Sequence, residues 1–252
     1  NLDRRALGEK AKEMGFVRDT LEKVFRLTEI IAFINSDSIL SKNLILKGGT
    51  AINLTVFNLP RLSVDIDLDL AINYSLRSHI FDSVLRPIVT SVTETELMVN
   101  TLVPSELFAA KLNALMNRAA VRDLYDINNM IRFGLFDESE YEELRKNTVF
   151  YAAISAETIN KDFKTDAIDD ITFAKVKRDL FPVIAKKDNF DLEQRKESAK
   201  LFIRELMILT DNEKEFLDRF EKKEFRPELV FEDEKIIARL EKHPMAIWKM
   251  GQ

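Results

Sequence analysis

Alternating aspartates within one apolar stretch constrain this chain most. In the stretch LSVDIDLDLAINY, residues 62–74, aspartates stand at positions 65, 67 and 69 between apolar residues. Period-two alternation with β-branched residues is typical of a β-strand. On a strand, Asp65 and Asp67 share one face and lie about 6.6–7 Å apart. Burying ionised carboxylates costs several kcal/mol without a partner, so the pattern requires a cation.

The expected partner of these carboxylates is a hard divalent cation. Two carboxylates on one face repel each other unless a cation lies between them, and Mg²⁺ or Mn²⁺ prefers such oxygen ligands. We therefore predict a metal site at Asp65 and Asp67. A cation of this kind also binds substrate phosphates, which indicates phosphoryl or nucleotidyl transfer. Asp69 is interpreted as a supporting residue at the strand end.

Two glycines precede the aspartates at a predicted strand-to-helix turn. The segment NLILKGG, residues 43–49, predicts a short buried strand, and TAINLTVF, residues 50–57, predicts the helix that follows. Gly48 and Gly49 lack a Cβ and would let a phosphate approach the backbone N–H groups at the helix start. Thr50 would cap this helix or contact the phosphate. The Walker pattern G-x-x-x-x-G-K-[ST] is absent.

Arg61 and Ser63 continue the period of two upstream of the aspartates. Ser63 would share a face with Asp65, and Arg61 would pair with a carboxylate, with a phosphate, or in an ordinary surface ion pair. Taken alone, the glycines also fit a tight turn and the aspartates a solvated strand end. Their order along the chain favours the functional interpretation.

A second set of charged residues follows in the stretch SELFAAKLNALMNRAAVRDLYDI, residues 105–127. On a straight helix, Lys111, Arg118 and Arg122 fall near one line, with Asp126 about 60° further round. Such a row suits a triphosphate, because lysine neutralises phosphate charge and arginine clamps it. The alternative is a solvated basic stripe. Asp123 and Asp126 would hold Arg118 or Arg122, or cap a next helix if the first breaks near Arg122.

Composition indicates an α+β fold. Gly and Pro number only six each among 252 residues, which favours a largely helical protein. Helical spacing covers residues 17–35, and strand signals nearly vanish after Pro104. We expect a small mixed sheet with flanking helices in residues 1–103. A mainly helical part, residues 104–252, would follow it.

Charge and apolar content limit the partners. The net charge of −5 provides no overall basic field, so a nucleic acid would need a local patch. Residues 175–200 are a candidate for gripping RNA phosphates, although interleaved acidic residues also fit a solvated helical face. No apolar run approaches the roughly 20 residues that span a membrane. Together with the absence of cysteine, this predicts a cytoplasmic protein without a membrane partner.

These motifs in series resemble the AbiEii/AbiGii-type nucleotidyltransferase toxins of bacterial type IV toxin–antitoxin and phage-defence systems. That family belongs to the DNA polymerase β-like nucleotidyltransferase superfamily. The resemblance therefore implies a nucleotidyltransferase-type core in residues 1–103 and a helical domain, residues 104–252, that completes the active site and contacts the acceptor. The matching residues are Lys47-Gly48-Gly49-Thr50, then Arg61-x-Ser63-x-Asp65-x-Asp67, then the helix with Lys111 and an acidic motif at Asp123 or Asp126. The resemblance covers about half of the chain.

The resemblance implies a metal-dependent enzyme that transfers a nucleotide from an NTP to an RNA acceptor, with tRNA as the expected acceptor. It assigns Asp65 and Asp67 to Mg²⁺ or Mn²⁺. It assigns the nucleotide phosphates to Gly48, Ser63 and Lys111. Further candidates for binding the nucleotide are the other residues of the matching motif, Lys47, Gly49, Thr50 and Arg61, and the two arginines in line with Lys111 on a helix, Arg118 and Arg122. Lys111 with Asp123 or Asp126 completes the catalytic set. A cognate AbiEi-type antitoxin encoded nearby is the implied partner.

One position departs from the superfamily pattern. A third acidic residue is expected on a later strand, and the corresponding position here reads Ala71, on a predicted strand that follows Asp69 with no connecting segment. Glu94 and Glu96 are fallback candidates. Two alternatives therefore stay open beside RNA modification. One is nucleotidylation of a protein or small molecule, and the other is a degenerate, non-catalytic module that binds nucleotide or antitoxin.

Overall fold

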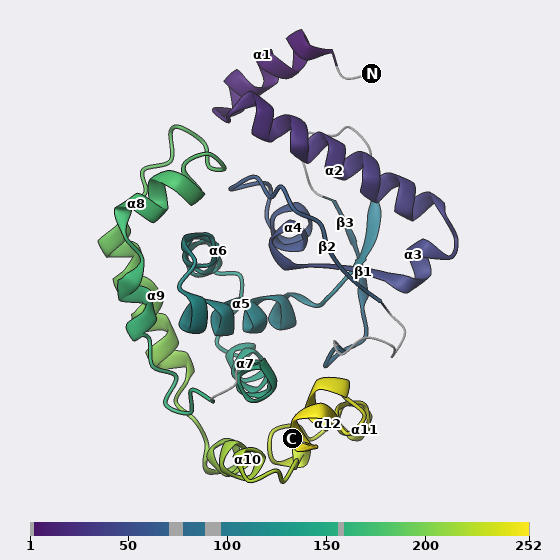
Figure 1. Cartoon of the computed structure of the whole chain (residues 1–252), viewed down its shortest axis with the longest axis vertical. Helices are drawn as coiled ribbons and strands as arrows, with labels where there is room; N and C mark the ends of the chain where they lie inside the picture. Colours follow the sequence, from purple (N-terminus) through teal and green to yellow (C-terminus); the bar gives the residue numbers. More distant parts are fainter. Residues whose placement is uncertain (1–2, 71–77, 89–96, 156–158, 252) are drawn as a thin grey trace. The chain divides into compact units, whose positions relative to one another are not determined.

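The computed structural model describes residues 3–70, 78–88, 97–155 and 159–251. The chain divides into two compact units (Figure 1). The first contains Asn1–Ala71, Ser83–Leu102 and Ile171–Leu192, and the second contains Ile72–Asp82, Val103–Asp170 and Glu193–Gln252. The expected division into an α/β core up to residue 103 and a helical domain beyond it stays a prediction.

The first unit is built around a four-stranded mixed sheet in the order β2-β1-β4-β3. β1 runs antiparallel to β2 and parallel to β4, and β3 runs antiparallel to β4. The strands are β1 (Leu44–Lys47), β2 (Asp67–Leu70), β3 (Val84–Pro87) and β4 (Met98–Thr101). The helical elements are α1 (Arg4–Met14), α2 (Arg18–Ser36), α3 (Leu40–Asn43), α4 (Gly48–Ala51), the π-helical turn η1 (Ile52–Val56), α8 (Phe173–Lys175) and the π-helical turn η3 (Val176–Leu180).

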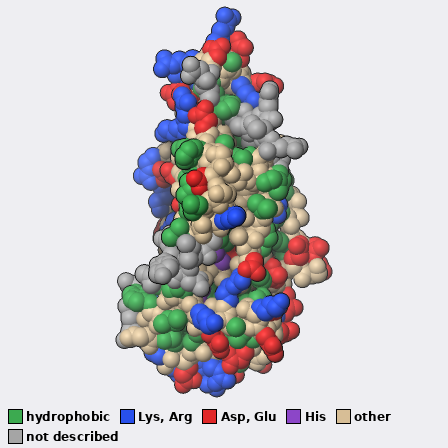
Figure 2. Space-filling model, turned by 90° about the vertical axis from the view of Figure 1, so that its right-hand side faces the viewer, with side chains coloured by type: hydrophobic (Ala, Val, Ile, Leu, Met, Phe, Trp, Pro, Cys, Tyr) green, Lys and Arg blue, Asp and Glu red, His purple; other side chains and the backbone are tan. Residues whose placement is uncertain are grey.

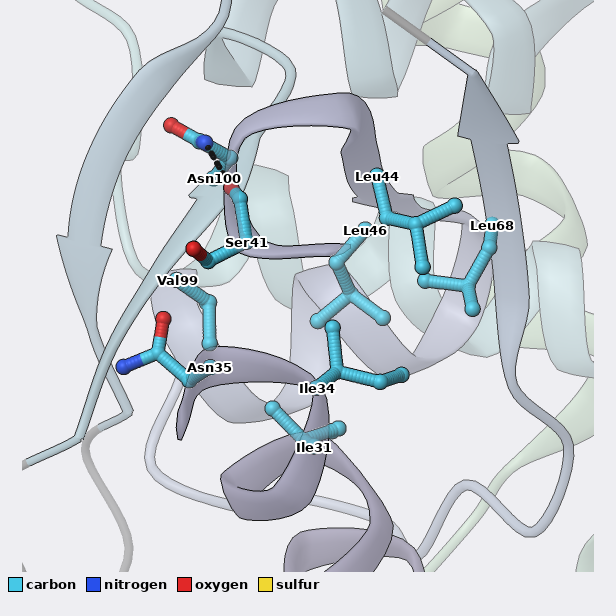
Figure 3. Close-up of a pocket in the computed structure, with 9 residues that line it drawn as sticks. All are labelled: Ile31, Ile34, Asn35, Ser41, Leu44, Leu46, Leu68, Val99 and Asn100. Carbon is cyan, nitrogen blue, oxygen red and sulfur yellow. Dashed lines mark hydrogen bonds between the residues drawn. The ribbon is translucent and has the colours of Figure 1, made fainter. Parts of the chain in front are cut away.

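One face of the sheet is apolar and lies beside α2. A small pocket there is lined by Ile31 and Ile34 of α2 and by apolar residues of the strands, among them Leu46 and Leu68 (Figure 3). Because successive side chains of a strand point to opposite faces, the residues next to Leu46 and Leu68 face away from α2. Lys47, Asp67 and Asp69 therefore lie on the opposite face of the sheet.

The second unit is helical. Its longest described helices bury apolar side chains against one another, and α5 packs against both α6 and α7. The elements are α5 (Pro104–Arg118), α6 (Val121–Arg132), α7 (Tyr141–Ser155), the 3₁₀ turn η2 (Asp166–Asp170), α9 (Leu192–Leu206), α10 (Asp211–Glu221), the 3₁₀ turn η4 (Pro227–Leu229), α11 (Glu234–Leu240) and α12 (Pro244–Met250). The predicted fold class, a mixed sheet with flanking helices followed by a mainly helical part, is confirmed.

The aspartate strand is shorter than predicted. Regular pairing begins at Asp67, opposite Lys47, and Asp65 lies before the strand. The physical cause is the partner strand, because β1 turns into α4 directly after Lys47 and offers Asp65 no pairing position. The prediction that a strand places Asp65 and Asp67 on one face is therefore wrong. The part of the predicted strand from Ala71 onward lies outside the described residues.

The sequence left open a break near Arg122, and the structure places the break slightly earlier, between Arg118 and Val121, so the alternative of one straight helix through Lys111, Arg118 and Arg122 is wrong. α5 ends at Arg118, and Ala119 takes a left-handed conformation with φ 49°. Its N–H still bonds to the Leu115 carbonyl at 3.2 Å, which closes the last turn before α6 begins. Lys111 and Arg118 thus lie on one helix and Arg122 on the next, so the three cations do not form one stripe.

Within the described residues, no helix is both long and apolar enough to cross a membrane.

Candidate active site

In the turn after β1, the Asp67 carboxylate fills the space that a side chain at position 48 would occupy. Gly48 has φ 66°, a conformation that favours glycine. A Cβ built on Gly48 would lie 2.2 Å from Oδ2 of Asp67. Ordinary contacts of this kind are above 3.4 Å, so any other residue at position 48 would displace the Asp67 carboxylate. Gly48 is thus required both by its backbone angle and by the space that Asp67 fills.

The neighbouring glycine stands against a buried guanidinium. A Cβ on Gly49 would lie 2.6 Å from Nη2 of Arg61 and 3.2 Å from Oγ of Ser63. Arg61 is only 2% exposed, and its Nη1 donates to the Leu62 carbonyl at 3.2 Å. The Arg61–Leu62 backbone is itself held by Val183 and Ile184, since the Leu62 N–H donates to the Val183 carbonyl at 2.7 Å. Arg61 therefore supports the glycine turn from inside the unit.

Thr50 ties the turn to the aspartate segment. Its hydroxyl lies 2.9 Å from Oγ of Ser63 and donates to the backbone carbonyl of Asp65. Thr50 and Ser63 are both buried, and Thr50 does not cap α4 with its side chain. These contacts fix the backbone at Asp65, which the strand does not reach.

The three aspartates differ in environment. Asp65 and Asp67 are exposed, whereas Asp69 is 7% exposed. Nζ of Lys47 donates to Oδ2 of Asp69 at 2.6 Å. Lys47 thus neutralises the buried Asp69, whereas the carboxylates of Asp65 and Asp67 face solvent.

The donor set fits the implied divalent cation in kind. Asp65 and Asp67 supply carboxylate oxygens, the ligands that Mg²⁺ prefers, and Mg²⁺ usually binds through one or two carboxylates while keeping several waters. Among the described residues, no group of three or more His, Cys, Asp or Glu gathers into a metal site. The positions named for a third acid, Ala71, Glu94 and Glu96, lie outside the described residues.

The second unit holds a buried charge cluster on α5 and α6. Nζ of Lys111 lies 2.8 Å from Oδ1 of Asp123 and 3.2 Å from Oδ2 of Asp126. Arg118 Nε donates to Oδ2 of Asp123 at 2.8 Å. The lysine and both aspartates are buried, and Arg118 is mostly exposed. The two cations balance the two carboxylates, while Arg122 is half-buried at the start of α6.

The sequence interpretation missed two polar residues that the structure makes prominent. Asn53, fully buried, donates from Nδ2 to the Gly49 carbonyl at 2.8 Å and so braces the turn. The signal was an asparagine inside the apolar helix, four residues after Gly49. Glu106 on α5 is fully buried and accepts from the Tyr151 hydroxyl at 2.5 Å and from the Ile80 N–H at 2.8 Å. Burial raises the pKa of Glu106 to about 7 despite these bonds.

Several basic side chains of residues 175–200 pair with acidic neighbours. Arg178 Nη2 lies 2.7 Å from Asp179, and Lys200 Nζ lies 2.5 Å from Asp169. These ion pairs agree with the solvated-face alternative for this segment. On the face drawn in Figure 2, basic and acidic side chains are likewise interspersed.

Comparison with known proteins identifies the family. The family model described as nucleotidyl transferase AbiEii toxin, type IV toxin–antitoxin system, matches residues 31–72 and 69–229. The two matched segments meet at residues 69–72, where Asp69 runs into Ala71 without a connecting segment. No curated protein and no solved structure matches the chain. Since the family model covers most of its length, the chain belongs to the AbiEii nucleotidyl transferase toxin family of type IV toxin–antitoxin systems.

Proposed function

We propose that this chain transfers a nucleotidyl group from an NTP to an RNA acceptor, with tRNA as the expected substrate. The observation that carries the proposal is the exposed Asp67 carboxylate held against the Gly48 turn, in a chain of a nucleotidyltransferase family. In this reaction an acceptor hydroxyl oxygen bonds to the α-phosphorus of the NTP, pyrophosphate leaves with the electron pair of the broken bond, and the hydroxyl proton is released.

The residues of the first unit have distinct roles in this proposal. Asp65 and Asp67 hold the divalent cation, which when bound neutralises phosphate charge and stabilises the transition state. The N–H groups of the Gly48–Gly49 turn approach the phosphates, because neither glycine places a Cβ in the way. Thr50 and Ser63 fix the backbone that carries Asp65.

Lys111 of the second unit is proposed to neutralise the triphosphate, with Asp123 or Asp126 in the catalytic set. Their ion pairs hold the ammonium in one place before substrate binds. Arg118, which pairs with Asp123 and is mostly exposed, and Arg122 are the proposed phosphate clamps. An antitoxin encoded by an adjacent gene is the proposed partner that restrains the activity in the cell.

The proposal is tested by label transfer. The purified chain is incubated with each α-labelled NTP, Mg²⁺ and total RNA, and in parallel with lysate protein free of RNA. Label is expected in RNA of tRNA size, and Asp65→Asn and Asp67→Asn should each remove it. Asp218→Asn, which breaks a surface ion pair with Lys161, is the matched control and should retain it.

The other outcomes separate the alternatives. Label in protein alone would reject an RNA acceptor and favour protein nucleotidylation. Label in neither fraction, together with binding of NTP, would favour a non-catalytic nucleotide-binding module, for which Ala71 is the motivating residue. Label in RNA that survives both substitutions would show that the reaction does not use this aspartate pair.

A further inference from the structure

Lys47 can reach either of two carboxylates on the neighbouring strand. The register places Lys47 directly opposite Asp67, and Asp69 is opposite Ile45, two residues away. In an antiparallel pair, directly opposite Cβ atoms are about 4.5–5.5 Å apart and diagonal neighbours about 7–8 Å, both within reach of a long side chain. The direct partner, Asp67, is the closer position.

The lysine nevertheless pairs with the diagonal aspartate. Its Nζ lies 2.6 Å from Oδ2 of Asp69, and the two side chains are 17% and 7% exposed. Within the described residues, no hydrogen bond or ion pair reaches the carboxylate of Asp67. The burial of Asp69 explains the choice, because a buried carboxylate loses more when it is left without a counter-ion than an exposed one does.

From this arrangement we infer that Asp69 is a positioning residue that holds the Lys47 ammonium away from Asp67, so that the Asp67 carboxylate stays open to a divalent cation. The inference rests on the proposed function, in which Asp65 and Asp67 bind that cation. Lys47 then acts as a counter-ion inside the unit. Its charge is taken up by Asp69 and does not compete with the metal.

Removing Asp69 frees the lysine to compete. In Asp69→Asn, the only carboxylate on the facing positions of β2 is Asp67, directly opposite Lys47. An ammonium on Asp67 occupies the oxygens that the cation needs. The affinity for Mn²⁺ is expected to fall by about three- to tenfold, the range in which a partly exposed ion pair operates.

The test is direct Mn²⁺ binding without nucleotide, followed by the loss of the electron paramagnetic resonance signal of free Mn²⁺. The variants are Asp69→Asn, Lys47→Met combined with Asp69→Asn, and Asp67→Asn as the baseline for adventitious binding. Asp218→Asn, which removes the aspartate of a Lys161 pair, is the matched control. The double variant lacks the competing ammonium and is expected to bind Mn²⁺ as the parent does.

Each outcome decides a specific point. If Asp69→Asn binds Mn²⁺ as tightly as the parent, the inference is overturned. If the double variant is as weak as Asp69→Asn, Asp69 is itself a ligand and not a positioning residue. A parent chain no better than Asp67→Asn would overturn the proposed metal site instead.

The double variant also guards against misfolding. Asp69→Asn leaves a partly buried ammonium without its carboxylate and can lower stability, whereas removing both partners is usually tolerated. If Asp69→Asn does not fold, the double variant alone still discriminates. Parent-like Mn²⁺ binding supports a positioning role, and weakened binding contradicts it.

Discussion

Replacing Gly48 by alanine is expected to damage the site far more than the fold. The substitution adds one methyl group at a backbone angle of φ 66° and places it 2.2 Å from Oδ2 of Asp67. The left-handed conformation costs an alanine about 1–2 kcal/mol. The clash is additional, because the Asp67 carboxylate or the turn has to move by about 1 Å to restore ordinary contact, and a misplacement of that size can reduce a rate about 100-fold.

A second glycine provides the control for the conformational cost of alanine at a positive φ. Gly134, just after α6, also has a positive φ of 57°, but nothing lies within 4 Å of the Cβ that a substitution would add. Gly134→Ala therefore pays the conformational cost without a steric one. For a chain of this size, about 1 kcal/mol lowers the thermal midpoint by roughly 2–4 °C.

The assay compares the two variants in thermal denaturation and in label transfer to RNA. Gly134→Ala is expected to lose a few degrees and to keep its activity. Gly48→Ala is expected to lose a similar amount or slightly more, with transfer reduced about 100-fold. Equal activity of the two variants would refute the argument that Gly48 makes room for Asp67. Unfolding of Gly48→Ala with normal Gly134→Ala would assign Gly48 a structural role instead.

Two further predictions concern the second unit. Lys111→Met leaves the buried Asp126 without this ammonium and should cost about 3–5 kcal/mol of stability, whereas Lys161→Met at an exposed pair should shift the thermal midpoint little. Glu106→Gln should reduce the pH dependence of stability. Burial raises the pKa of Glu106 from 4.5 to about 7. The contribution of Glu106 to the free energy of unfolding is therefore fully present below pH 4.5, and about 3 kcal/mol of it is lost as the pH rises through 7. Burial lowers the pKa of His243 to about 4, which gives the opposite slope up to pH 6.5. The measurement is therefore the difference in thermal midpoint between the parent and Glu106→Gln from pH 4.5 to 8, and equal slopes would contradict it.

Local sequence patterns alone were sufficient to predict the elements that lead into the candidate site. Helical spacing predicted residues 17–35, and α2 spans Arg18–Ser36. The apolar run before Gly48 predicted β1, and the helix after the glycines was also predicted, because a strand-glycine-helix turn is encoded by neighbouring residues. These features depend on backbone propensity and on the burial of one short segment, which a single sequence contains.

The errors arose where a distant element decides the outcome. β2 begins only at Asp67 because its partner β1 ends at Lys47, opposite Asp67, and the residues of β2 themselves do not encode this limit. The end of α5 at Arg118 has no glycine or proline to announce it, and Ala119 takes the left-handed angle that ends the helix. Ion pairs from Lys111 and Arg118 to Asp123 join the two helices across this corner.

Burial, and not spacing, determines which of the three aspartates pairs with Lys47. By spacing alone, Asp65, Asp67 and Asp69 are equivalent, and the register would give Lys47 to Asp67. The carboxylate that most needs a counter-ion is the buried one, since the attraction between charges grows as water is removed. Asp69 therefore takes the lysine, and Asp67 remains exposed beside the Gly48 turn. Lys47 and Asp69 thus form a neutralised pair, and the Asp67 carboxylate on the same face of the sheet stays exposed, as the proposed cation site requires.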